Sequence, residues 1–354
     1  MGDLLLTGGN RRRLQYLPLL GRISSLPKSV RQLPLSSIAQ KVAMLSPTVA
    51  VAWSGSFVVA RRTLTDLRDF VLDRRAISGV DLLSCLDNLD YGDWKHLSLI
   101  GLVARQEEVS DLFFHNANHK KHEAYGDVLA GGSGSGFLFS SMATLDFKRE
   151  LSRFSLLVAG AKALVEELFT VYPLKMGFGG AYEFAFPKHG VITKIDNLLY
   201  IFWVVGDYDR LRECGDTGIL RLASGPLILK QFYVDDVAII LRASLSKNVY
   251  AGAPRPYGRG ELNLCIAAPP FADRSSSSIT FDDERVNQRG LVSSIFALRR
   301  DDKWEFLLHV DTPREDELSV QFDLKKRRST LSWSKAYWER VMEEAGRRIR
   351  EHAE

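Results

Sequence analysis

Residues 41–72 have the sequence KVAMLSPTVAVAWSGSFVVARRTLTDLRDFVL, which contains the clearest local structural pattern in the chain. Val49 to Trp53 is a short apolar run rich in β-branched residues. The Ser-Gly-Ser that follows it predicts a buried strand ending in a tight turn. From Phe57 to Leu72, apolar residues recur mostly at steps of three and four with charged residues between them, which predicts an amphipathic helix.

A second stretch repeats this order about sixty residues later. Asp127 to Ala130 predicts a strand, GGSGSG follows at residues 131–136, and a second helix is expected from Phe137. The motifs AVAWSGS and LAGGSGSG, in this order and at this distance, resemble the proteasome β-subunit-like branch of the N-terminal-nucleophile hydrolases. The resemblance covers residues 3–205.

The resemblance implies an α+β fold in which residues 1–205 form a four-layer α/β/β/α sandwich. The sequence itself predicts antiparallel strands at residues 97–104 and 109–115, and a long helix at residues 147–172. It predicts polar connections at residues 82–94 and 116–123. Residues 206–354 predict a smaller β-rich domain, with a hairpin at residues 291–310 and a terminal helix at residues 332–353.

Composition places the chain among ordinary globular proteins, with 45% hydrophobic and 25% charged residues. The net charge of +4 arises from 47 basic and 43 acidic residues, which does not indicate a dedicated nucleic-acid binder. Three widely spaced cysteines favour a reducing compartment. Because no apolar run reaches about 18 residues, no transmembrane helix is expected, and a cytoplasmic location is predicted.

The catalytic chemistry of the resembled family requires a hydroxyl or thiol on the first residue, with the free α-amine as its base. Met1 is followed by Gly2, so removal of Met1 would expose no nucleophile. The resemblance places the family's lysine at Lys41 and its Gly-Ser-Gly serine at Ser133. These two are the candidate catalytic residues.

The other polar positions of the family are not kept in this sequence. Its first aspartate falls on Gly9, its second near Lys175, and a further serine falls on Phe178. Lys41 also fits a lysine at a strand edge, and turn geometry also explains Ser133. Self-cleavage before Thr48 would place Arg61 and Arg62 where an acid is needed and would discard Lys41. Cleavage before Thr7 would leave the strand too short.

Two further motifs bear on metal and nucleic-acid binding. His115, His119 and His122 have a spacing that suits zinc if the segment is helical, whereas a solvated hairpin loop is the alternative. The basic runs at residues 11–13 and 325–328 predict solvated surface, and a nucleic-acid adaptor is a third, weaker hypothesis. No cofactor and no metal are predicted.

These observations predict a catalytically inactive, proteasome-like scaffold or partner-binding protein. The resemblance implies a homo-oligomer, and the C-terminal domain is the expected contact for a protein partner. The alternative is a threonine-type peptidase or amidohydrolase of the N-terminal-nucleophile class, activated by processing.

Overall fold

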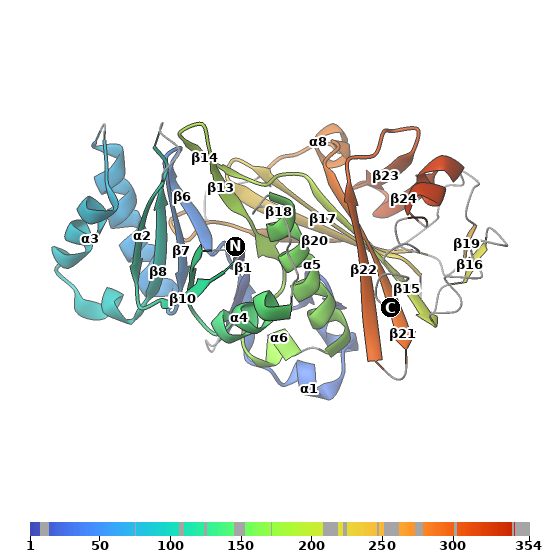
Figure 1. The fold of residues 1–354 in the computed structure, drawn as a ribbon, viewed down its shortest axis with the longest axis horizontal. Helices are drawn as coiled ribbons and strands as arrows, with labels where there is room; N and C mark the ends of the chain where they lie inside the picture. Colours follow the sequence, from blue (N-terminus) through green and yellow to red (C-terminus); the bar gives the residue numbers. More distant parts are fainter. Residues whose placement is uncertain are drawn as a thin grey trace. The chain divides into compact units, whose positions relative to one another are not determined.

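The fold is described from a computed structural model (Figure 1). The chain forms two compact units. Unit 1 comprises residues 1–195, 235–238 and 266–278, and unit 2 comprises residues 196–234, 239–265 and 279–354. The structure describes residues 1–7, 14–74, 76–105, 110–123, 126–144, 153–170, 172–207, 219–221, 225–245, 248–250, 262–272, 279–300, 303–341 and 343.

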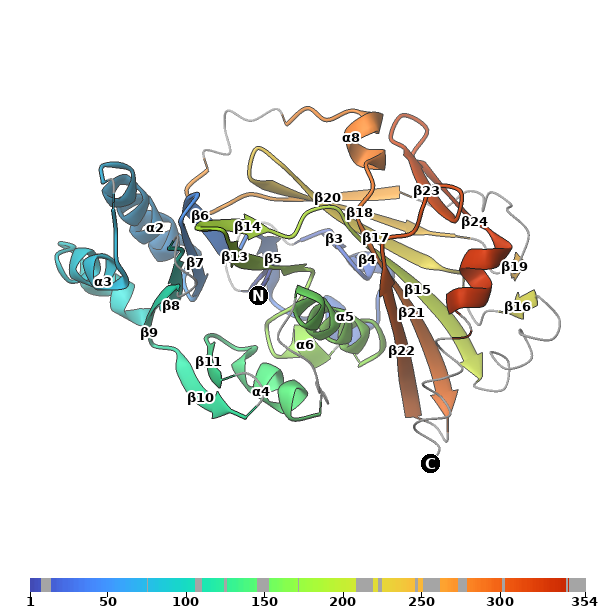
Figure 2. The same cartoon turned by 45° about the horizontal axis from the view of Figure 1, so that its top comes forward.

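The main sheet of unit 1 has four antiparallel strands in the order β6-β7-β8-β9. The strands are β6 (Val42–Ser46), β7 (Val49–Ser54), β8 (Ser98–Val103) and β9 (Asp111–His115). Helices α2 (Phe57–Leu72) and α3 (Gly79–Asp87) lie on one side of this sheet in Figures 1 and 2. The predicted strand, glycine turn and helix of residues 49–72 are therefore present as β7 and α2.

Apolar side chains from this sheet and from α2 and α3 form one core. Val51, Trp53 and Leu99 of the sheet pack with Leu64 and Leu67 of α2, and each of the five is at most 3% exposed. Apolar residues alternate along the strands and recur at steps of three and four along the helix. The apolar side chains of both elements therefore face each other.

Short strand pairs and helices complete unit 1. The pairs are β1 (Gly2–Asp3) with β12 (Tyr182–Glu183), β2 (Leu5–Thr7) with β5 (Leu35–Ile38), β3 (Tyr16–Leu17) with β4 (Gly21–Arg22), β10 (Asn118–His122) with β11 (Gly126–Ala130), and β13 (Ala185–Lys188) with β14 (Val191–Lys194). The helices are η1 (Ile23–Ser25), α1 (Lys28–Arg31), η2 (Gly92–His96), α4 (Ser135–Thr144), α5 (Arg153–Thr170) and α6 (Tyr172–Lys175).

Unit 2 is built on a six-stranded sheet in the order β20-β18-β17-β15-β21-β22. These strands are β15 (Leu198–Asp207), β17 (Leu227–Val234), β18 (Val237–Ser244), β20 (Leu262–Ala267), β21 (Leu291–Arg300) and β22 (Lys303–Asp311). The predicted hairpin is β21 and β22, and β21 also pairs with β15 in parallel. Further elements are β16 (Ile219–Arg221), β19 (Asn248–Tyr250), α8 (Asp283–Asn287), β23 (Leu318–Asp323) and β24 (Arg328–Trp333).

Three predicted segments differ from the structure. Residues 82–94 are not one polar connection, because α3 extends to Asp87 and η2 covers Gly92–His96. Residues 116–123 are not a loop, because β10 pairs with β11 along its whole length. The predicted terminal helix begins later than Ser332, since β24 extends to Trp333 and the described helical residues start at Lys335.

At the level of class, the fold is α+β with several separate sheets, as predicted. The predicted domain boundary at residues 205/206 lies inside β15, whereas the two compact units divide first after Ile195. Among the described residues, no helix is both long and apolar enough to cross a bilayer.

Candidate functional site

Lys41 and Ser133, the two predicted site residues, line the same cavity in unit 1. The cavity has a volume of about 110 Å³. Its other walls come from residues 1–3, from the ends of β7 and β8, from the glycine turn before α4, and from Phe178 and Tyr182. The structure therefore brings together residues that are about 90 positions apart in the sequence.

Lys41 lies directly before β6 and is only 8% exposed. Its Nζ is 3.9 Å from Oδ1 of Asp3 and 5.2 Å from the ring centroid of Trp53. The Trp53 indole is held in turn, because its N–H donates to the carbonyl of Gln40 at 2.9 Å. Lys41 is thus a buried cation held between one carboxylate and one aromatic face.

A second carboxylate, that of Glu183 in β12, fixes the backbone at Lys41. Oε2 of Glu183 accepts hydrogen bonds from the backbone N–H groups of Lys41 at 2.8 Å and Val42 at 3.1 Å. Its Oε1 pairs with Nζ of Lys194 at 2.9 Å, and that amine also donates to the side chain of Gln40 at 2.5 Å. Because Glu183 is fully buried, this network holds the start of β6 in place.

The glycine turn between β11 and α4 forms the opposite wall of the cavity. A Cβ atom on Gly131 would lie 2.0 Å from Oγ of Ser98, and Gly132 has a φ of +78°. Both positions therefore require glycine. Ser133 is exposed, and its hydroxyl donates to the carbonyl of Gly177 at 3.3 Å. That bond ties the turn to the segment that follows α6.

Three further positions at which the resembled family carries polar groups are occupied by Phe178, Lys175 and Gly9 here. Phe178 lines the cavity, is 3% exposed and lies 5.4 Å from the ring of Phe137 between centroids. Lys175 is exposed and does not line the cavity. Gly9, the third position, lies outside the described residues.

Two acidic residues near the cavity have raised pKa values. Burial raises the pKa of Asp3, and the charge of Lys41 partly offsets this effect. Burial raises the pKa of Glu167 to about 8. The hydrogen bond that its Oε2 accepts from Gly180 N–H at 2.7 Å acts in the opposite direction and lowers this pKa. Within the described part of the chain, Oε1 of Glu167 and the hydroxyl of Tyr182 are buried without a hydrogen-bond partner. The raised pKa favours the protonated form of Glu167.

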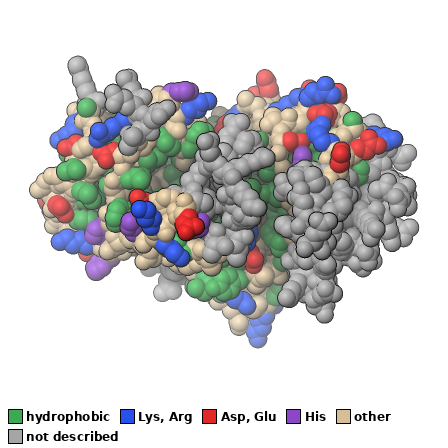
Figure 3. Space-filling model, in the orientation of Figure 1, with side chains coloured by type: hydrophobic (Ala, Val, Ile, Leu, Met, Phe, Trp, Pro, Cys, Tyr) green, Lys and Arg blue, Asp and Glu red, His purple; other side chains and the backbone are tan. Residues whose placement is uncertain are grey.

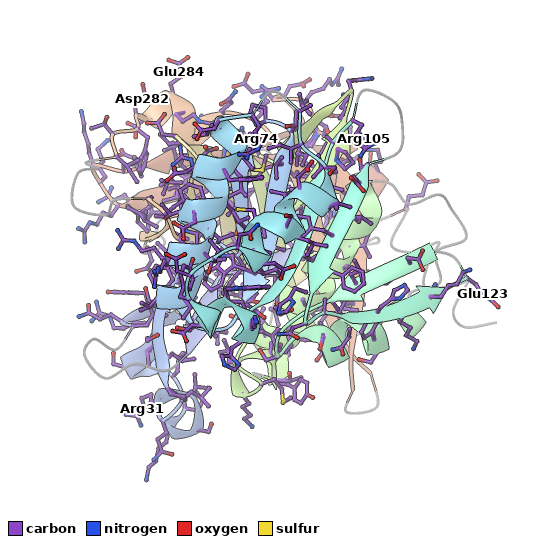
Figure 4. All side chains as sticks on the ribbon, turned by 90° about the vertical axis from the view of Figure 1, so that its left-hand side faces the viewer. Arg31, Arg74, Arg105, Glu123, Asp282 and Glu284 are labelled. Atoms are coloured by element: carbon purple, nitrogen blue, oxygen red, sulfur yellow. The ribbon has the colours of Figure 1, made fainter. Side chains whose placement is uncertain are left out.

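The three histidines whose spacing would suit zinc on a helix lie on β9 and β10. His119 pairs with Asp127 at 2.8 Å, and His115 contacts the carbonyl of Lys95 at 3.0 Å. The described residues contain no group of three metal-ligating side chains. Figure 4 places Glu123 at the tip of the β10–β11 ribbon, and residues 118–122 form a paired strand, not the helix that the zinc spacing would need.

Basic side chains form no continuous patch on the face shown in Figure 3, where lysines and arginines are interspersed with acidic residues among the coloured atoms. Residues 325–328 form the turn between β23 and β24 and continue into β24, and Lys326 pairs with Asp323 at 3.0 Å. The other basic run, residues 11–13, is outside the described residues.

The sequence analysis did not identify Asp3 and Glu183, whose carboxylates contact Lys41 and its backbone, or the buried Glu167. A usable signal was present for two of them. Glu183 interrupts the apolar run AYEFAF, and Glu167 lies on the apolar side of α5 within LVEELF. A charged residue inside an apolar segment indicates a buried polar partner, because an unpaired buried charge is costly.

No protein-family model matches this chain, and no curated protein sequence matches it either.

Proposed function

We propose that unit 1 is a proteasome-like domain, built as a four-layer sandwich, that lacks peptidase activity. In this proposal it serves as a scaffold that self-associates or binds a protein partner, and unit 2 supplies further partner contacts.

One observation carries the proposal: both residues that match the resembled family make contacts that hold structure. Lys41 is paired with Asp3 and lies beside the Trp53 ring, and Ser133 donates its hydroxyl to a backbone carbonyl. A nucleophilic serine needs a base that accepts its proton. Among the described residues, the Ser133 hydroxyl has no hydrogen bond to a side chain that could act as this base.

Phe178 gives independent support. In the resembled family a serine stands at this position, whereas here a buried aromatic ring lines the cavity. An aromatic ring offers no hydrogen-bond donor to an oxyanion, so it removes a source of transition-state stabilisation.

The helices α2 and α3 support self-association. They expose Val58, Leu72 and Val80 by 76%, 60% and 74% respectively. In the resembled family the helical layers form the contacts between subunits, and burying these side chains would favour such a contact.

The proposal is tested by labelling the full chain with a vinyl-sulfone probe and a fluorophosphonate probe, and by measuring its intact mass. We expect no labelling above that of heat-denatured protein, and the mass of the unprocessed chain. Labelling that is lost in Lys41→Met but kept in Lys28→Met, an exposed lysine in the same unit, would overturn it.

A threonine- or serine-type amidohydrolase remains the second candidate, because Lys41, Ser133 and residues 1–3 share one cavity. A product that begins with Thr, Ser or Cys, together with probe labelling at that new terminus, would favour this candidate over the scaffold.

A further inference from the structure

A second cavity, of about 100 Å³, lies within unit 2 and contains a buried lysine. Lys230 is 5% exposed and comes from β17, in the middle of the apolar run LILKQFYV. In the sheet register it is the direct partner of Leu199 on β15, which is in turn the partner of Val292 on β21. Side chains at directly paired positions lie on the same face of a sheet, and all three residues line the cavity.

Other walls come from the segment between α8 and β21, from the segment between β22 and β23, and from β23. Gln288 and Arg289 line the cavity from the first, Glu315 from the second, and Leu318 and Phe322 from the third. The lining therefore combines apolar side chains with one amine, one guanidinium group and the Glu315 carboxylate, which is paired with that guanidinium group.

In the described part of the chain, no carboxylate forms an ion pair with Lys230, because the two nearby carboxylates are paired with arginines. Arg285 is paired with Asp196 at 2.7 Å, and Arg289 is paired with Glu315. Nζ of Lys230 donates to the backbone carbonyl of Gln288, which accounts for one of its three ammonium protons. A buried ammonium normally needs an anion beside it.

We propose that this cavity binds the carboxylate of a small organic acid, with the oxygens on Lys230 and the carbon chain against Leu199, Val292 and Leu318. The site lies in unit 2 and does not depend on the function proposed for unit 1. Arg289 can supply a second charge-assisted hydrogen bond, since only part of its guanidinium fork is used by Glu315.

The pH dependence of binding follows from the state of the amine. Burial, and then the charge of Arg285, lower the pKa of Lys230 to about 8, while Asp196 acts in the opposite direction. An anion binds the protonated amine, so affinity is highest below pH 8 and falls about tenfold per pH unit above it.

Calorimetric titration of the full chain with butyrate, butyramide and inorganic phosphate at pH 6.5 and pH 9.5 tests the proposal. We expect saturable butyrate binding at the lower pH, weaker binding at the higher pH, and none with butyramide, which has the same shape but no charge. Phosphate binding without butyrate binding would show an oxyanion site of another kind and would contradict the proposal.

Variants locate the site. Lys230→Met keeps the buried alkyl chain and should abolish butyrate binding, whereas Lys335→Met, at a lysine side chain that is 72% exposed, should leave it unchanged. Equal binding by all three proteins overturns the proposal.

A second measurement avoids the need for a folded variant. Acetic anhydride labels amines, and mass spectrometry reports the labelling rate at Lys230 in the wild-type chain. At butyrate concentrations ten times the Kd, occupancy predicts labelling of Lys230 that is about tenfold slower, with no change at Lys335. An unchanged rate at Lys230 contradicts the inference.

Discussion

The protonation of a single residue, Glu167, affects the stability of unit 1. Its pKa is about 8 in the folded chain because of burial, against an ordinary value of 4.5. The folded state thus retains a proton between pH 4.5 and pH 8 that the unfolded state has released. The stability that this proton contributes is present below pH 4.5 and is lost as the pH rises through 8.

We expect Glu167→Gln to remove this dependence. The amide oxygen can still accept from Gly180 N–H, so at pH 8 the variant should be more stable than the wild type by about 1–3 kcal/mol. At pH 4.5 the two should be equal. Urea denaturation across this range checks the prediction, and parallel curves for the two proteins would contradict it.

Glu183 provides a residue-scale test of the network that holds Lys41. Glu183→Gln leaves Lys194 charged and buried, so we expect a loss of about 3–5 kcal/mol in the free energy of unfolding. Adding Lys194→Met should recover part of that loss, because it removes the buried amine that faced the Glu183 carboxylate. The exposed carboxylate of Asp127 gives a control, since Asp127→Asn should change stability by about 0–1 kcal/mol.

Lys41 and Ser133 are candidates because local motifs resemble those of a known family, and the structure places both in the lining of one cavity. Their partners could not be predicted from the sequence, since Asp3, Glu183 and Gly177 are brought beside them only by pairing between distant strands and turns. What the sequence did contain was a set of charged residues inside apolar runs, namely Glu167, Glu183 and Lys230. Each of them is at most 5% exposed in the structure.

Within the sheet of unit 1, the pairing of β8 with β9 depends on one glycine, Gly101. Gly101 is the register partner of Phe113, and a Cβ atom at Gly101 would lie 1.6 Å from Cε1 of that ring. Phe113 is 2% exposed and packs in the core, so its ring has no free space in which to move.

We therefore expect Gly101→Ala to destabilise unit 1 by about 1–3 kcal/mol through overpacking. Gly92→Ala is the matched control, because a Cβ atom at Gly92 meets nothing within 4 Å. Thermal unfolding followed by circular dichroism measures both. Recovery of stability in Gly101→Ala with Phe113→Leu would assign the loss to this contact, and equal effects of the two single substitutions would contradict it.

The strength of the apolar pattern within each element decided whether it could be predicted from the sequence. β7 and α2 followed from strong periodicity, whereas α3 was missed because its apolar face is short. Ser78 accepts from the backbone N–H of Asp81 while the Asp81 carboxylate accepts from Ser78, a capping box that marks the start of α3. β10 has no apolar pattern, and its pairing with β11 alone makes it a strand.

At the scale of the whole molecule, the sequence predicted two parts but not how the chain is shared between them. The chain leaves unit 1 after Ile195 and returns to it at residues 235–238 and 266–278. Gln40 bonds both returning segments, because its side-chain amide donates to the carbonyls of Asp236 and Ala267. A buried amide that contacts residues some 200 positions away leaves no local signal in the sequence.

We expect the whole molecule to self-associate. Light scattering of the native chain should give a mass that is a multiple of one chain, because contacts through α2 and α3 would bury Val58 and Val80. Val58→Lys and Val80→Lys together should yield the monomer, since each places a charge in the contact. The mass should remain unchanged in Val191→Lys, which makes the same substitution on β14 at a side chain that is 42% exposed. A wild-type chain that is monomeric at all concentrations would rule out the self-associating scaffold. Dissociation by Val191→Lys alone would move the contact away from the helices.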